Sequence, residues 1–221
     1  NIVQELVYRN DSLVQATNFT KNGNISYKVK YKKGIISEIK DYYPSGKSKI
    51  ETKLIWSEDN QNYYIEKAYY TNGKLEYEGE VNIINDKKYR RGWWIFYTKE
   101  GKAELMLEFI NEGKIEIENQ RIVIDVNNQT IKKNDSHFFE KKIIEKNKDS
   151  IKVNIKYFSP DTILGNILYI RDEEGNELKQ VKSKTKGYDW DITISSKDPT
   201  IRAIVKTKNG KGAKYYYEII K

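Results

Sequence analysis

The chain has 221 residues, of which 38% are hydrophobic, 33% charged and 13% aromatic, and its formal net charge is +8. Most of its aromatic residues are tyrosines, which suit half-exposed sheets because the ring is apolar while the hydroxyl stays solvated. The chain has no cysteine, which excludes disulfides and cysteine-based metal sites, and no apolar run approaches the roughly 20 residues of a membrane-spanning helix.

Charge is distributed unevenly along the chain. Residues 1–120 carry a net charge of +1, whereas residues 121–221 carry +7. A shift of this kind indicates two domains with different surfaces. We therefore expect a near-neutral domain over residues 1–120 and a basic domain over residues 121–221.

The first domain reads as a series of β-hairpins. Apolar and polar residues alternate along it, which predicts strands rather than helices. Strands end repeatedly in an aromatic residue, a few polar residues and a glycine, namely Gly23, Gly46, Gly73 and Gly101. These glycines are 23, 27 and 28 residues apart, and such a period is typical of repeat proteins. Glycine supplies the positive φ of a tight turn, so turns are also expected at Gly34 and Gly113.

Several of these motifs share more than the glycine. They are YYPSGK at 42–47, YYTNGKL at 69–75, YEG at 77–79 and GWWIFY at 92–97. Over residues 17–115 they resemble the bacterial variant of the MORN repeat, found in a family of toxin–antitoxin-type antitoxins. The resemblance implies an elongated meander of β-hairpins with a binding or scaffolding role. Residues 54–64 lack the expected glycine, which argues against a regular hairpin there.

The second domain also reads as all-β. A polar stretch at residues 127–136 predicts a linker or long loop. Seven short strand-like runs with turns between them then predict a small immunoglobulin-like β-sandwich. The runs are residues 137–145, 151–158, 163–172, 177–184, 188–195, 201–208 and 213–220. The candidate core residues are Val153, Ile155, Tyr157, Tyr188, Trp190, Ile192 and Ile194.

The densest aromatic cluster is the main candidate binding surface. Alternation places Trp94 and Phe96 on one face of a strand and Trp93 and Tyr97 on the other. A single-layer sheet does not bury both faces fully, so one pair is expected to be exposed to a partner. The competing interpretation is packing between consecutive hairpins. The aromatic residues of the Gly-turn motifs extend this candidate surface with Tyr43 and Tyr70.

A row of lysines in the basic domain is a second candidate surface. Lys182, Lys184 and Lys186 alternate on one strand face. Such a row is either a solvated, aggregation-resistant strand or a site for an anionic envelope component, lipid or glycan. Nucleic acid is a disfavoured partner, because stacking on single strands needs basic and aromatic residues interleaved, and here they lie in different halves.

The sequence predicts no catalytic, cofactor-binding or metal-binding residues. His137 is the only histidine and follows Asp135 and Ser136, but neighbours on a strand point to opposite faces and so do not converge as a catalytic triad. One histidine and no cysteine exclude the usual zinc sites. The acidic segment at 172–176 lacks the spacing of a calcium loop and reads as a hairpin turn.

These features favour a non-enzymatic binding or scaffold protein of the bacterial cell envelope or exterior, with a protein as its main partner. The first residue is Asn rather than Met, from which we expect a removed signal peptide and a periplasmic, outer-membrane-associated or secreted location. Two alternatives stay open. One is an intracellular antitoxin-like inhibitor that binds a toxin protein, and the other is a glycan-active or glycan-binding envelope protein.

Overall fold

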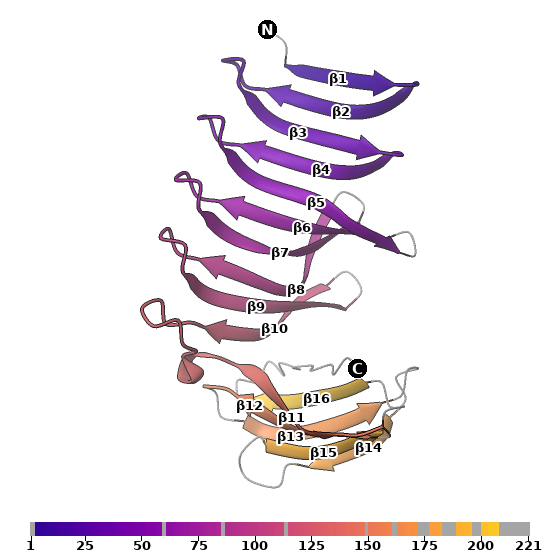
Figure 1. Ribbon diagram of the computed structural model, residues 1–221, viewed down its shortest axis with the longest axis vertical. Coiled ribbons are helices and arrows are strands. Elements are labelled where there is room, and N and C mark those ends of the chain that lie inside the picture. Colours follow the sequence, from indigo (N-terminus) through magenta and orange to yellow (C-terminus); the bar gives the residue numbers. More distant parts are fainter. Residues whose placement is uncertain are drawn as a thin grey trace. The chain divides into compact units, whose positions relative to one another are not determined.

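Figure 1 shows the computed structural model of the chain. The structure describes residues 3–58, 61–84, 87–112, 115–148, 150–160, 163–171, 177–182, 189–195 and 200–207. Over these residues the predicted all-β class is confirmed, because the described chain consists of strands, turns and one short 3-10 helix, η1 (Lys133–Asp135).

The chain divides into two compact units. The first comprises residues 1–118 and 124–130, and the second comprises residues 119–123 and 131–221. The domain boundary expected after residue 120 falls within a strand, β10 (Ile115–Val123). Each unit has its own buried residues.

The first unit is built on a ten-stranded sheet in which the order of the strands in space follows their order in the chain (Figure 1). Consecutive strands from β1 to β9 pair antiparallel, as the alternating sequence with tight turns requires. The first nine strands are β1 (Gln4–Arg9), β2 (Ser12–Phe19), β3 (Ile25–Lys32), β4 (Ile35–Tyr42), β5 (Ser48–Glu58), β6 (Gln61–Tyr69), β7 (Leu75–Ile84), β8 (Lys87–Tyr97) and β9 (Ala103–Glu112).

The expected glycine turns lie on one side of this sheet, at the ends of β2, β4, β6 and β8 (Figure 1). We call this row of turns the glycine-turn side. In the third of them, the Gly73 N–H donates to the Tyr70 carbonyl and the Tyr70 N–H donates to the Lys74 carbonyl, both at 2.8 Å. The same pair of bonds closes the other three turns. The glycine φ angles are 82° at Gly23, 80° at Gly46, 86° at Gly73 and 87° at Gly101.

The turns that follow β1 and β3, at the other ends of the strands, are of a different kind. Lys33 and Gly34, between β3 and β4, have φ angles of 52° and 77°, and Asn10 and Asp11 have 49° and 58°. Two consecutive positive φ values are typical of a type I′ turn, whose twist matches that of the paired strands. Over β1 to β4 the chain therefore alternates between the two kinds of turn. Gly113 lies outside the described residues.

Side chains sort onto two faces of the sheet, because neighbours on a strand point to opposite sides. One face, the charged face, places residues of opposite charge across from one another on paired strands: Lys30, Glu38, Lys40, Glu51, Lys67 and Glu78. The other, the apolar face, carries buried residues along the same strands: Val29, Ile39, Tyr64, Ala68, Val81, Trp94 and Leu107.

The core of the apolar face gathers around Trp94. Its indole packs with Tyr64, Val81, Leu107 and Phe109, all of them buried. The packing depends on Gly79, because a β-carbon there would stand 2.3 Å from the indole ring. The Trp94 Nε1–H donates to the Glu80 carbonyl at 3.1 Å, which satisfies the polar end of the ring.

The second unit has two three-stranded sheets, one ordered β11-β12-β15 and the other β14-β13-β16. The strands are β11 (Phe138–Lys146), β12 (Ser150–Phe158), β13 (Ile163–Arg171), β14 (Glu177–Lys182), β15 (Asp189–Ser195) and β16 (Thr200–Thr207). Six of the seven expected strand-like runs therefore form strands, and the run at 213–220 lies outside the described residues, as does Tyr188. Among the core candidates, the buried side chains are Val153, Ile155, Tyr157, Trp190 and Ile192.

Candidate functional site

The four aromatic residues of the predicted cluster lie on β8 but have different surroundings. Trp94 is 3% exposed and belongs to the core, and Phe96 packs against that core. Trp93 and Tyr97 lie half-buried on the charged face, where the Tyr97 hydroxyl donates to Glu78 at 2.8 Å. Trp94 therefore stabilises the fold, and the surface part of the cluster consists of Trp93 and Tyr97.

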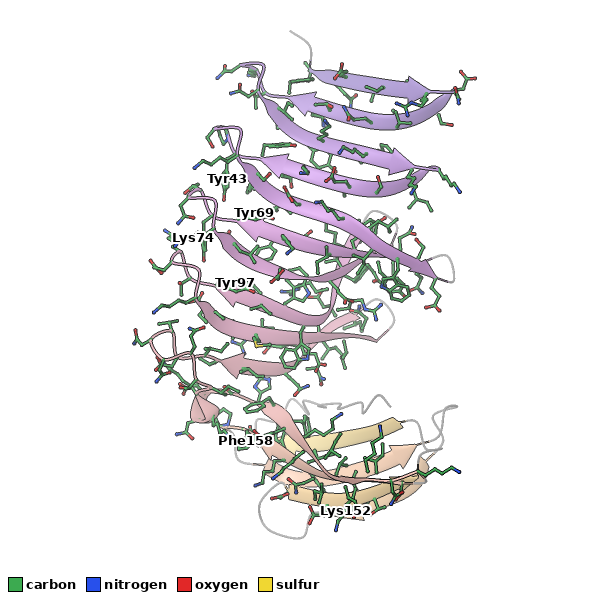
Figure 2. The ribbon with its side chains drawn as sticks, in the orientation of Figure 1. Tyr43, Tyr69, Lys74, Tyr97, Lys152 and Phe158 are labelled. Atoms are coloured by element: carbon green, nitrogen blue, oxygen red, sulfur yellow. The ribbon has the colours of Figure 1, made fainter. Side chains whose placement is uncertain are left out.

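Tyr43 and Tyr70 connect consecutive glycine turns. The Tyr43 hydroxyl donates to the Tyr69 carbonyl, and the Tyr70 hydroxyl donates to the Tyr97 carbonyl, each at 2.7 Å. Figure 2 shows Tyr43, Tyr69 and Tyr97 at successive positions along the glycine-turn side of the sheet. The two hydroxyls thus hold the spacing between repeats.

Lysines also connect consecutive turns on the glycine-turn side. The Lys47 ammonium donates to the Thr71 carbonyl at 3.2 Å, and the Lys74 ammonium donates to the Glu100 carbonyl at 2.7 Å (Figure 2). Both bonds run from one turn to the next turn in the chain. The lysine that follows glycine in the repeat motif is therefore explained by the stacking of turns.

The predicted lysine row lies mostly outside what the structure describes. Lys182 is the last residue of β14, and Lys184 and Lys186 are not among the described residues. An anionic ligand for this row stays a prediction.

Ion pairs cross the charged face from strand to strand. Lys30 pairs with Glu38 at 2.6 Å, Lys40 with Glu51 at 3.1 Å, and Lys67 with Glu78 at 2.9 Å. The hydrogen bond from Lys67 lowers the pKa of Glu78 below its usual value. These pairs compensate the charges of Glu38, Glu51 and Glu78, while Lys28 lies opposite Lys40, so the face carries charges of both signs rather than one strong field.

The apolar face has a polar cluster beneath the start of β8. Glu66 is buried, forms an ion pair with Lys88 and accepts a hydrogen bond from the Thr52 hydroxyl at 3.1 Å. Since β8 lies three strands from β5 in the sheet, about 14 Å at the usual spacing, Lys88 reaches Thr52 only if the start of β8 bends over this face. Burial, followed by the charge of Glu66, raises the pKa of Tyr77 to about 12.

An exposed stack of planar side chains on the charged face is the strongest candidate binding site. The rings of Trp56 and Tyr63 stack with centroids 3.7 Å apart and an interplanar angle of 10°. The Arg91 guanidinium carbon lies 4.5 Å from the Tyr63 ring centroid and 5.9 Å from that of Trp56. Trp56 is 40% exposed. We call Trp56, Tyr63 and Arg91 the Trp56 stack.

Strand pairing positions the Trp56 stack. Trp56 lies directly opposite Tyr63 in the β5–β6 pair, and an irregularity between Leu54 and Trp56 turns Trp56 onto the charged face. Arg91 lies opposite Glu80 on the β7–β8 pair, and their side chains are 3.7 Å apart. Strands β5, β6 and β8 thus contribute one side chain each to the stack.

Polar amides lie beside the Trp56 stack. Gln61 Oε1 accepts hydrogen bonds from the Tyr63 hydroxyl at 3.0 Å and from Asn82 Nδ2 at 3.4 Å. Within the described chain, the buried Asn82 Oδ1 has no hydrogen-bond partner. A buried acceptor without a partner is unusual, because burying a polar group without a hydrogen bond costs about 1–3 kcal/mol.

The residues around His137 have structural roles. The Ser136 hydroxyl is buried, accepts a hydrogen bond from the Val123 N–H at 2.9 Å and donates to the Lys132 carbonyl at 2.7 Å. His137 exchanges backbone hydrogen bonds with Arg121 at 2.8 and 2.9 Å. These contacts fix the segment that leads into β11.

The part of the chain that the structure describes contains no group of three or more histidine or acidic side chains arranged to hold a metal ion. None of its helices has the length and apolarity needed to cross a bilayer.

Comparison with models of known protein families gives no match, and comparison with curated protein sequences gives none either. The resemblance to the MORN repeat therefore depends on the motifs alone.

Sequence reasoning did not select the Trp56 stack. Residues 54–64 stood out only as a departure from the repeat pattern, yet Ser57 pairs with Asn62 and Glu58 with Gln61 in an antiparallel hairpin. The expected departure from a regular hairpin corresponds to the shift in register between Leu54 and Trp56. The sequence features that could have indicated this site are the tryptophan at position 56, which departs from the repeat pattern, and the Arg90-Arg91 pair.

Proposed function

We propose that this chain is a non-enzymatic protein-binding protein whose interaction surface is centred on the Trp56 stack. The observation that carries the proposal is the contact among Trp56, Tyr63 and Arg91 on an accessible part of the sheet. Tryptophan, tyrosine and arginine are the residues that dominate the energetics of protein interfaces, and they do so when clustered.

The stack is ordered before any partner binds. Parallel rings 3.7 Å apart leave little rotational freedom to Trp56 and Tyr63, so binding costs less side-chain entropy there than at an isolated aromatic residue.

The matched ion pairs of the charged face favour recognition by shape and hydrogen bonding. Glu38 lies close to Lys30, Lys40 and Lys53, at 2.6, 3.6 and 3.9 Å, so its charge is already compensated. A surface of this kind gives little long-range attraction to a charged partner. A protein whose complementary patch is aromatic or aliphatic with a polar rim fits it best.

The architecture we propose for this function is a MORN-like array followed by an immunoglobulin-like sandwich. The contact between Gly79 and Trp94, which joins the YEG and GWWIFY motifs, supports the first part. The two three-stranded sheets of the second unit support the second part. Stacked repeats build extended surfaces, which suits a binding or scaffolding role in the bacterial cell envelope or exterior.

Capture experiments with the full chain test the proposal. The immobilised protein is exposed separately to envelope and cytosolic fractions of the native organism, and retained proteins are identified by mass spectrometry. We expect an envelope protein to be retained by the wild type and by Trp56→Phe, which keeps a planar ring, and lost with Trp56→Ala. Ile35→Ala, at an exposed position by the β3–β4 turn, is the matched control and should retain it.

The outcomes separate the candidate functions. Equal retention by wild type and Trp56→Ala would contradict the proposed surface. A partner found only in the cytosolic fraction would instead support the antitoxin-like alternative. Binding of purified envelope polysaccharide that disappears with Trp56→Ala would support the glycan alternative, because sugar rings also stack on exposed indoles.

A further inference from the structure

Strand β1 forms an open edge of the ten-stranded sheet. Within the described residues it pairs with β2 alone, and all six of its side chains are exposed, including Leu6 at 45%, Val7 at 37% and Tyr8 at 59%. Proteins usually protect such edges with charged side chains, especially lysine, or with proline or a bulge, because an open edge accepts another strand. β1 has neither lysine nor proline, and its two charged residues, Glu5 and Arg9, are of opposite sign.

The edge is also regular. The shift in the β1–β2 register places Val7 opposite Gln15 and Tyr8 opposite Leu13, so the extra residue is Val14 of β2. An extra residue bends the strand that contains it, which is β2 here. β1 therefore keeps the even alternation that a second strand needs.

Hydrogen-bond alternation shows which groups of β1 point outward. The Phe19 N–H donates to the Val3 carbonyl at 2.9 Å, so the backbone groups of Val3 face β2. In an antiparallel pair this direction alternates from residue to residue. Hence Glu5 and Val7 also face β2, whereas the N–H and C=O groups of Leu6 and Tyr8 point away from the sheet.

The sequence of β1 is complementary to itself in one antiparallel register. With Val7 opposite the Val7 of a second copy, Leu6 faces Tyr8, and Glu5 faces Arg9 of the opposite charge. In this register the outward-pointing backbone groups of Leu6 lie opposite those of Tyr8 in the second copy, as hydrogen-bonded pairing requires. A shift by one residue would place outward-pointing backbone groups opposite groups that face β2.

The same register continues both faces of the sheet. Leu6 pairs with Ala16 and so belongs to the apolar face, while Glu5 and Val7 lie on the other side. The Leu6–Tyr8 contacts would extend the apolar face across the junction. The two Glu5–Arg9 pairs would extend the ladder of ion pairs on the charged face.

We propose that two copies of this chain associate through antiparallel β1–β1 pairing about a two-fold axis at Val7, which makes one continuous sheet. The contact involves only six residues per copy, so the dimer forms at high protein concentration rather than as an obligate assembly. It would carry two Trp56 stacks and would bind a multivalent partner with increased avidity. The inference does not depend on the proposed function.

Charge exchange at the edge tests the proposal, with the full chain studied by sedimentation velocity over a range of concentrations. We expect the wild type to dimerise as concentration rises. Glu5→Arg and Arg9→Glu each replace both attractive cross-strand pairs by repulsive ones and should weaken dimerisation about tenfold or more. The double variant Glu5→Arg/Arg9→Glu restores opposite charges and should restore the dimer.

A proline probe examines the hydrogen bonds independently. The Leu6 N–H points away from β2, so Leu6→Pro removes a donor of the proposed junction while leaving the β1–β2 bonds. Circular dichroism and a urea midpoint confirm that each variant is folded. A wild type that stays monomeric at millimolar concentration, or a dimer indifferent to the charge exchanges and to Leu6→Pro, would overturn the proposal.

Discussion

The indole of Trp94 lies directly on the backbone of Gly79, so that even a methyl group at Gly79 would overlap the ring. Gly79→Ala must displace either the ring or strand β7. We expect it to lower the free energy of unfolding by about 1–3 kcal/mol, the usual cost of overpacking a core. Urea denaturation monitored by tryptophan fluorescence measures the change.

The Trp94→Leu background supplies the control, because it removes the ring that a new methyl group would meet. Gly79→Ala should therefore cost less in that background than in the wild type. An equal cost in both would show that the contact between Gly79 and Trp94 does not limit the packing.

Gly73 tests the backbone requirement of the repeat turns. Its φ is +86°, and a β-carbon at this position would meet nothing within 4 Å. A substitution thus acts through backbone strain alone, and Gly73→Val should cost on the order of 1–3 kcal/mol. Gly73→Asn should cost clearly less, because asparagine tolerates the left-handed region. Thermal denaturation of the two variants makes the comparison, and equal losses would contradict the turn geometry.

Tyr70 tests the link between consecutive turns. Tyr70→Phe removes the hydroxyl that donates to the Tyr97 carbonyl at 2.7 Å and leaves the ring in place. We expect a loss of about 1 kcal/mol in the free energy of unfolding, and a similar loss for Tyr43→Phe. The two turns are different sites, so the double variant should show nearly the sum. An unchanged urea midpoint would mean that the backbone alone holds the repeats in register.

Alkaline pH should destabilise the first unit through two tyrosines. Burial and the hydrogen bond to Glu78 raise the pKa of Tyr97 to about 12, and burial beside Glu66 raises the pKa of Tyr77 to about 12. In the unfolded chain these phenols titrate near 10. Their stabilisation is therefore complete below about pH 10 and is lost as pH rises towards about 12.

Melting temperatures measured from pH 9 to 12 check this prediction. The wild type should lose stability more steeply in this range than Tyr97→Phe, which cannot ionise at that position. Lysines also titrate there, so the difference between the two proteins, rather than either curve alone, isolates the tyrosine. Parallel curves would contradict the raised pKa of Tyr97.

Local patterns in the sequence were enough to predict much of the fold. The alternation in β3 and the glycines at 46 and 73 each determine structure within a few residues, so strands and turns follow from them. The opposite faces of Trp93 and Trp94 follow from the same alternation. Which of the two is buried does not, because it depends on Gly79, 15 residues before Trp94 in the sequence.

The Trp56 stack could not be predicted from local sequence patterns, because it also depends on residues that are distant in the sequence. Trp56 meets Tyr63 only because of one irregularity in the β5–β6 register, and Arg91 joins them from β8. A shift of one residue in either pair would turn these side chains to the apolar face. Registers of this kind are set by the packing of whole strands, which no short motif encodes.

The affinity of the captured protein for the chain and its variants tests the central claim most directly. Isothermal titration should show at least about a thirtyfold loss for Trp56→Ala, corresponding to the 2 kcal/mol or more that a hot-spot residue contributes. Arg91→Ala should also weaken binding, and Ile35→Ala should leave it unchanged. Affinities for Trp56→Ala and Arg91→Ala equal to that of the wild type would contradict the assignment of the Trp56 stack as the binding surface.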